Sequence, residues 1–183
     1  MYGPVIQGKL LRLRPPRAED AATMVGWFED MEVTHFLFVR MAMSHEQEKE
    51  WIEARAKDPD SINWVVEVDG RTVGSTGIQM IDWKNGFGTT GTVIGDKTVW
   101  GKGVGRELMR LRAEFLFTNT PLRKLKSGYL DGNVASGRAQ AACGYVQVGR
   151  WRKDRFVDGE WRDVILTELL REEWEKRRGE LES

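Results

Sequence analysis

The chain has 183 residues, of which 40% are apolar and 31% charged, a composition that suits a soluble globular domain and excludes a largely disordered chain. Lysine plus arginine and aspartate plus glutamate each number 28, so no overall positive charge favours nucleic acid. A single cysteine excludes an internal disulfide framework and fits a reducing compartment.

The first residues, "MYGPVIQGKL", lack the charged start and apolar run of a signal peptide. No apolar stretch of the sequence approaches the ~20 residues that a membrane-spanning helix needs. We therefore expect a cytoplasmic protein with neither a membrane nor a nucleic acid as its partner.

The first expected element is a half-buried strand. "KLLRLRPP", residues 9–16, alternates Leu11 and Leu13 with Arg12 and Arg14, and the two prolines end the strand. We interpret the basic residues here, and those of "GRWRKDR" at 149–155, as solvated strand faces.

Two helices follow in the predicted order. Residues 18–30 carry Met24 and Trp27 at helical spacing. Ser44 and Gln47 form a capping box that opens the second helix, over 45–57.

Turn residues then divide a series of predicted strands and helices. Asp69-Gly70 and Asn85-Gly86 predict hairpins, so that three consecutive antiparallel strands lead to a glycine-rich segment. An apolar stripe predicts the helix that follows. The later elements are expected to be a strand over 124–130, a helix over 133–143, strands over 145–157 and 160–170, and a charged surface helix over 171–183.

No internal repeat or linker divides the sequence. The predicted order of elements indicates one α+β domain over residues 1–183, with a mixed, mostly antiparallel sheet flanked by helices.

The glycine-rich segment "VWGKGVGREL", residues 99–108, places three glycines in alternation directly before a helix. Its spacing fits neither a P-loop, since Gly103 follows the lysine, nor a dinucleotide fingerprint, since the third glycine falls one residue early. Bare amides at a helix N-terminus could hold a diphosphate or a similar anion. A turn that only reverses the chain is the alternative, and the segment by itself leaves both open.

Residues outside this segment favour the anion site. Trp100, Gly101, Lys102, Gly103, Val104 and Gly105 resemble motif A of the GNAT N-acetyltransferases, with tryptophan where Gln or Arg is usual. Asn133, Ser136, Gly144 and Tyr145 stand at the intervals of a later motif found in the ribosomal-protein (RimJ/RimL) branch. The resemblance extends from Leu10 to Trp174 and implies a GNAT-like fold.

The resemblance also implies acetyl-CoA as cosubstrate and no metal. The pantetheine arm would pair with the strand end near Val93 and Ile94, and the pyrophosphate would lie on the amides of residues 101–106. The expected cofactor-binding residues are therefore Val93, Ile94, Trp100, Gly101, Lys102, Gly103, Val104, Gly105, Arg106 and Asn133. Two histidines and one cysteine cannot assemble a metal-ligand cluster.

Members of the family transfer the acetyl group directly, so Cys143 is expected to be a core residue rather than a nucleophile. Two catalytic positions of the family depart here: Thr89 replaces a glutamate and Gln140 replaces a tyrosine. Ser136 remains as the candidate catalytic group beside the thioester sulfur, with a hydroxyl that only supports the start of a helix as the alternative. The general base stays open among His35, Asp82, Asp163 or no residue at all.

The leading hypothesis is an enzyme that moves acetyl to a primary amine, either a small molecule or a protein N-terminus. The alternative is a GNAT-fold module that binds acyl-CoA with lost or weak catalysis and acts as a sensor or partner. Members of the family are often dimers, so we expect a homodimer. Trp27, Trp51 and Trp64 are predicted core residues, while Trp83, Trp151 and Trp161 are candidates for lining an acceptor groove.

Overall fold

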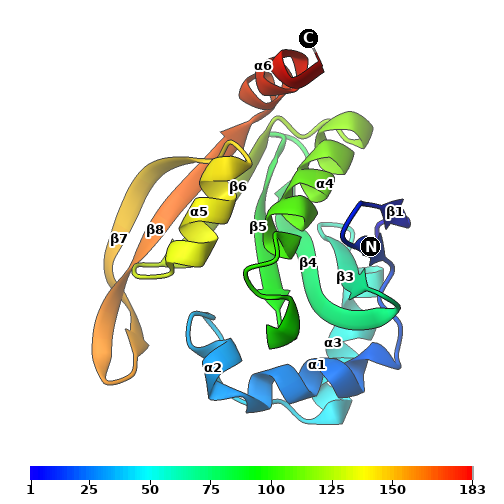
Figure 1. Cartoon of the computed structure of the whole chain (residues 1–183), viewed down its shortest axis with the longest axis vertical. Coiled ribbons are helices and arrows are strands. Elements are labelled where there is room, and N and C mark those ends of the chain that lie inside the picture. Colours follow the sequence, from blue (N-terminus) through cyan, green and yellow to red (C-terminus); the bar gives the residue numbers. More distant parts are fainter. Residues whose placement is uncertain (183) are drawn as a thin grey trace.

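The computed structural model describes residues 1–182, with side chains through residue 178. An eight-stranded sheet with the order β1-β2-β3-β4-β5-β6-β8-β7 forms its centre (Figure 1). The strands are β1 Ile6–Gln7, β2 Arg12–Arg14, β3 Ile62–Val68, β4 Arg71–Asp82, β5 Phe87–Ile94, β6 Lys124–Leu130, β7 Val146–Val157 and β8 Glu160–Leu170. The helices are α1 Asp20–Glu29, α2 Met31–Thr34, α3 His45–Lys57, the short 3-10 helix η1 Lys97–Val99, α4 Val104–Asn119, α5 Val134–Ala142 and α6 Arg171–Glu182.

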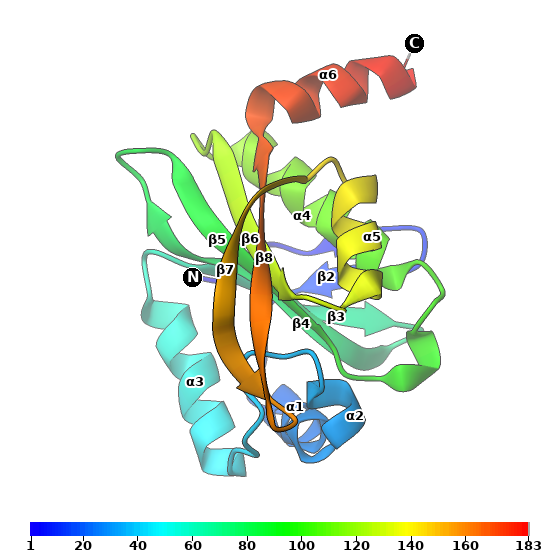
Figure 2. The ribbon, with the colours of Figure 1, turned by 90° about the vertical axis from the view of Figure 1, so that its left-hand side faces the viewer.

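Helices cover both faces of the sheet. Figure 2 shows α3 on one side of the strands and α4 and α5 on the other. The main core lies on the α4 side, where Trp64 of β3 and Leu108 of α4 are buried. A second cluster joins Trp27 of α1 to Ile52 of α3 on the opposite side. The fold class is therefore the predicted one, a mixed, mostly antiparallel sheet flanked by helices.

Most of the locally encoded elements are confirmed. β3, β4 and β5 form the predicted antiparallel series, and both halves of the Ser44–Gln47 capping box are present at the start of α3. The predicted helix over 18–30 instead ends at Glu29, because Asp30 adopts an extended conformation and its side chain caps the separate helix α2. The strand β1 and the helices α2 and η1 are too short to show a periodic pattern.

The prediction of a solvated basic face on β2 is wrong for Arg14. This side chain is only 6% exposed, and its guanidinium donates hydrogen bonds to Asp20 and Glu67. Burial alone raises the pKa of Asp20, but hydrogen bonds from Arg14, the Arg17 amide and Thr72 outweigh it and leave the pKa lowered. The alternation of β2 places Arg14 correctly on the face opposite Leu13, but α1 covers that face with a carboxylate.

Two further predictions need smaller corrections. Trp51 is half-buried at the edge of the second cluster, whereas Trp27 and Trp64 are buried as predicted. The C-terminal segment forms the predicted helix, but its indole at Trp174 packs 5.4 Å from the ring of Phe117. The first residue of this helix, Arg171, binds carbonyls at the end of α4.

The two halves of the sheet meet along a short seam. β5 and β6 are parallel and pair only through Phe87, Gly88 and Thr89 with Lys124, Leu125 and Lys126. Beyond Thr89 and Lys126, β5 and β6 no longer pair with each other, although each strand continues for several residues. This opening lies between the core of β1–β5 and the β6–β8–β7 half, and it positions the site.

Candidate active site

The opening between β5 and β6 begins at Thr90, where hydrogen bonds from side chains take the place of backbone pairing between the two strands. Thr90 Oγ1 donates to the Lys126 carbonyl at 3.1 Å, and the Ser127 hydroxyl donates to the Thr90 carbonyl at 3.4 Å. Further along, β5 keeps only β4 as a neighbour. The edge of β5 that faces β6 is therefore left without a partner strand.

Thr92 and Ile94 carry the backbone groups of this open edge. The carbonyl of Thr90 faces β6, and the carbonyl of Ile94 accepts a hydrogen bond from the Trp100 indole at 3.0 Å. Backbone groups of alternate residues point the same way along a strand, so those of Thr92 do too. Val93 stands opposite Ser75 in β4 and directs its amide and carbonyl there, which assigns any pairing at this edge to Thr92 and Ile94.

Arg112 of α4 braces β5 beside the opening. Its side chain is 1% exposed, and it donates to Thr76 Oγ1 at 2.6 Å, the Gly91 carbonyl at 2.9 Å and Thr92 Oγ1 at 3.0 Å. Because these acceptors belong to β4 and β5, the guanidinium ties the two strands together where β6 no longer supports them.

The glycine loop carries the strongest sign of a ligand site. Gly101 and Gly103 have positive φ angles of 72° and 84°, which glycine adopts without strain. A Cβ built on Gly101 or Gly105 would meet no atom within 4 Å, so packing against the protein does not explain the absence of side chains. Gly103 begins α4 without a side-chain cap, and amides in the first turn of a helix have no intrahelical acceptor.

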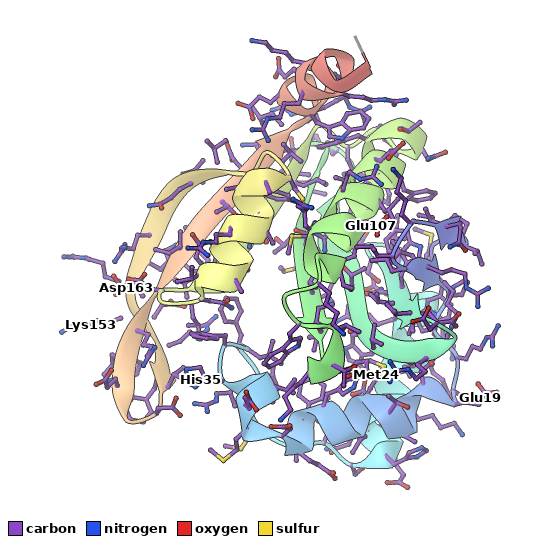
Figure 3. The ribbon with its side chains drawn as sticks, viewed as in Figure 1. Glu19, Met24, His35, Glu107, Lys153 and Asp163 are labelled. Atoms are coloured by element: carbon purple, nitrogen blue, oxygen red, sulfur yellow. The ribbon has the colours of Figure 1, made fainter. Side chains whose placement is uncertain are left out.

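Two cations flank this loop. Lys102 and Arg106 are exposed, and within the described residues neither side chain forms an ion pair with a carboxylate. The acid of the same turn, Glu107, instead accepts the backbone amides of Lys9 and Leu10 at 2.6 and 2.8 Å (Figure 3). The loop thus combines helix-start amides that lack intrahelical acceptors with two cations that form no ion pair within the described residues, an arrangement suited to a phosphate group.

The start of α5 brings Ser136 toward the same side of the sheet. Asn133 Oδ1 accepts the Ser136 amide at 3.0 Å and caps the helix. The Ser136 hydroxyl accepts a hydrogen bond from the side chain of Gln140 at 3.1 Å, and Gln140 accepts one from Thr167 at 2.5 Å. Sequence reasoning singled out Gln140 as a departure from the family, but it gave no sign of the contact with Thr167.

Cys143 has the surroundings of a packing residue. It is half-buried against the main core, and its thiol lies 3.3 Å from the Arg106 carbonyl. Burial raises the pKa of this thiol, which disfavours the nucleophilic thiolate at neutral pH.

The segment after α2 contains a histidine that already has a side-chain partner. His35 Nδ1 lies 2.9 Å from a carboxylate oxygen of Asp158, and Arg40 binds the other oxygen at 2.8 Å. These contacts join the segment after α2 to the tip of the β7–β8 hairpin, the two parts that Figure 3 shows meeting at His35. His35 thus has a structural partner in Asp158.

The two carboxylates considered as bases are also engaged. Asp82 accepts from the side chain and the amide of Asn85, which lowers the pKa of Asp82 and supports the β4–β5 turn. Asp163 accepts from the Lys153 amide and from Arg150, and both bonds lower the pKa of Asp163. Each carboxylate thus holds a turn or a bulge.

The sequence pattern gave no sign of one buried acid whose side chain has an unpartnered oxygen. Glu48 in the first turns of α3 is 1% exposed, its Oε2 has no hydrogen-bond partner among the described residues, and burial raises the pKa of its carboxyl. It lies one turn before Ile52, whose cluster also contacts Val93. Since Val93 and Thr89 lie on one face of β5, Glu48 belongs to the side of the sheet where the family glutamate would stand.

The three tryptophans proposed for an acceptor groove lie at the surface. Trp83 is 37% exposed and donates to the Pro59 carbonyl at 3.2 Å, so part of its role is structural. Trp151 and Trp161 are 53% and 60% exposed on β7 and β8. Trp161 packs against the equally exposed Phe156 at the hairpin, 5.3 Å between ring centroids.

Neither a metal-ligand cluster nor a membrane-crossing helix occurs in the described part of the chain. Among the described side chains, residues 1–178, no group of three or more His, Cys, Asp or Glu is arranged to hold a metal ion. Within the same residues, no helix combines the length and the apolar character that crossing a membrane requires.

Comparison with known proteins gives a family for this geometry. The family model described as "Acetyltransferase (GNAT) domain" matches residues 11–146. The "uncharacterized N-acetyltransferase p20" of Bacillus licheniformis is 24% identical over 169 residues, which cover 90% of this chain and 94% of that protein.

Solved structures share the fold. Spermidine N-acetyltransferase from Vibrio cholerae, in complex with CoA and spermine, superposes with a TM-score of 0.85 at 20% identity, covering 91% of this chain and 99% of that chain. RimL, a ribosomal L7/L12 alpha-N-protein acetyltransferase in complex with CoA, gives a TM-score of 0.83 at 12% identity, covering 91% and 98%. At these identities the superpositions show the fold.

Proposed function

This chain belongs to the GNAT acetyltransferase family, and from that premise we propose that it transfers the acetyl group of acetyl-CoA to a primary amine. The observation that carries the proposal is the glycine loop. Gly101 and Gly105 leave open space where side chains would stand, and the family supplies a ligand whose diphosphate requires such space. At Gly101 the positive φ alone favours glycine, whereas Gly105 is helical, so a loop that only reversed the chain would leave the bare backbone at Gly105 unexplained.

The chain's own residues divide the work of binding. The amides of residues 101–106 would hold the pyrophosphate, with Lys102 and Arg106 adding positive charge. Val104 is buried in the main core and anchors this first turn of α4. Thr92 and Ile94 offer the backbone edge to which the pantetheine arm could pair, while Trp100 restrains the Ile94 carbonyl. Asn133 holds the start of α5 beside them.

Acetyl-CoA supplies an activated acyl group. Transfer forms a carbon–nitrogen bond and breaks the carbon–sulfur bond, the electron pair leaves with sulfur, and the amine loses a proton. Ser136 is the group we assign to donate a proton to the departing sulfur. A donor that acts only as charge develops lowers the barrier without strengthening ground-state binding.

The acceptor is an amine of a small molecule or of a protein N-terminus. Both kinds occur among the relatives, since one is a spermidine N-acetyltransferase and another a protein alpha-N-acetyltransferase. A weakly active or inactive acyl-CoA-binding module is the second candidate. Thr89 and Gln140 favour it, because they replace two catalytic side chains of the family.

One experiment separates the two candidates. The protein is mixed with acetyl-CoA and, in turn, spermidine, spermine and peptides with free N-termini, while free thiol is followed and products are identified by mass. Amine-dependent thiol release with a product 42 Da heavier supports the enzyme. Calorimetric binding of acetyl-CoA without release favours the module, and absence of binding contradicts both.

A further inference from the structure

Two buried side chains form a series of hydrogen bonds that ends at the hydroxyl of Ser136. Gln140 on α5 is 3% exposed and Thr167 on β8 is 5% exposed. The Thr167 hydroxyl donates to Gln140 Oε1 at 2.5 Å, and Gln140 Nε2 donates to Ser136 Oγ at 3.1 Å. This series of hydrogen bonds leads from Thr167 in the sheet to the half-buried Ser136 at the start of α5.

The direction of these hydrogen bonds decides what Ser136 can do. In the structure the Gln140 side chain points its Oε1 toward Thr167 and its Nε2 toward Ser136, and an amide oxygen only accepts while an amide nitrogen only donates. The serine oxygen then accepts, and its own proton is free. Among the described side chains, residues 1–178, the Ser136 hydroxyl donates to no protein acceptor.

We infer that Gln140 is a positioning residue, held by Thr167, which presents the Ser136 proton to the leaving sulfur. This inference rests on the proposed function. In place of the tyrosine found in relatives, a buried amide orients the neighbouring serine as a donor. When the carbon–sulfur bond breaks, sulfur takes the electron pair and the Ser136 proton, and Ser136 regains a proton from solvent or from the acetylated ammonium.

The first test measures steady-state kinetics of three near-isosteric single variants and of Ser136→Ala. Gln140→Met and Thr167→Val should each lower kcat about threefold to thirtyfold, the effect of losing one oriented hydrogen bond, while the KM for acetyl-CoA changes less than twofold. Thr167→Ser keeps the donor and should retain kcat. In the Ser136→Ala background, Gln140→Met should have no further effect, because the residues act through one hydroxyl.

A matched control separates this role from a loss of stability. Thr120→Val removes a comparable threonine bond, to the Leu116 carbonyl at the far end of α4. It should lower the melting temperature as Thr167→Val does and leave kcat unchanged. Independent, multiplicative effects of Gln140→Met and Ser136→Ala on kcat would overturn the inference.

The binding arm does not depend on turnover. A hydroxyl that donates to sulfur stabilises the thiolate, so CoA should bind more tightly as pH rises through the thiol pKa, relative to an analogue with hydrogen in place of the thiol. We expect the affinity ratio of the two ligands to rise at least threefold between pH 7 and pH 9.5. It should stay flat in Gln140→Met and Ser136→Ala. A rise that both variants retain, or none in the parent, contradicts the inference even if no amine is acetylated, whereas absence of acetyl transfer alone contradicts only the proposed function.

Discussion

The proposed cofactor region and the proposed acceptor region differ in how their polar groups are occupied. In the first, formed by the glycine loop and the start of α5, Lys102, Arg106 and the Ser136 proton have no protein partner among the described residues. In the second, formed by the segment after α2 and the β7–β8 hairpin, His35 and Arg40 are already bound to Asp158. Under the proposed function, the groups that would meet a ligand are unpaired in the free protein, and the groups that shape the chain are already bound.

The largest expected effect belongs to the cofactor region. Ser136→Ala should lower kcat roughly tenfold to a thousandfold, the range for one lost donor, and should change acetyl-CoA affinity far less. Steady-state kinetics with a melting curve tests this. If the hydroxyl only supports the helix, kcat stays nearly intact and stability falls by about 1 kcal/mol, and the first region would lose its catalytic member.

The glycine loop should show the next effect. Gly105→Val should weaken acetyl-CoA binding at least tenfold, about 1.4 kcal/mol, because the side chain enters the space assigned to the diphosphate. Gly26 is the matched control: it is also helical, and a Cβ there also meets nothing within 4 Å. Gly26→Val should leave the affinity unchanged. Calorimetry that finds equal affinities in two folded variants would remove the loop from the site.

The acceptor region should respond weakly. His35→Gln keeps a hydrogen-bonding side chain beside Asp158, so we expect kcat to change less than threefold and stability by less than about 1 kcal/mol, as for a half-exposed ion pair. The measurement is kcat as a function of pH for both proteins. A hundredfold loss of kcat would identify His35 as the base and abolish the contrast between the regions.

The smallest effect concerns Glu48 of α3. Burial raises the pKa of the Glu48 carboxyl in the folded protein, whereas in the unfolded chain this carboxyl loses its proton near its ordinary pKa of about 4.3. Between these two pKa values the folded state binds the proton more tightly, so the free energy of unfolding falls as pH rises from the unfolded pKa to the folded one. Glu48→Gln removes this cost and should raise the melting temperature by a few degrees at pH 7 and hardly at pH 4. A lower melting temperature at pH 7 would show that the carboxylate has a favourable partner.

The features that depend only on neighbouring residues can be predicted from the sequence alone. Alternation placed Leu11 and Leu13 in the core, Asp69-Gly70 and Asn85-Gly86 marked the hairpins, and Ser44 with Gln47 marked the start of α3. Each of these is a local preference of the backbone, readable within a few residues. The glycine loop was found in the same way, although its ligand came from the resemblance to a family.

Which residues distant in the sequence come into contact depends on the tertiary structure. Gln140 and Thr167 are 27 positions apart, and no periodicity in either segment predicts that a helix and a strand will bring them into contact. The burial of Arg14 likewise depends on where α1 lies, not on the pattern of β2. The sequence around a polar side chain does not identify its hydrogen-bond partner, because the two groups pair only after tertiary packing has brought them together and removed water from them.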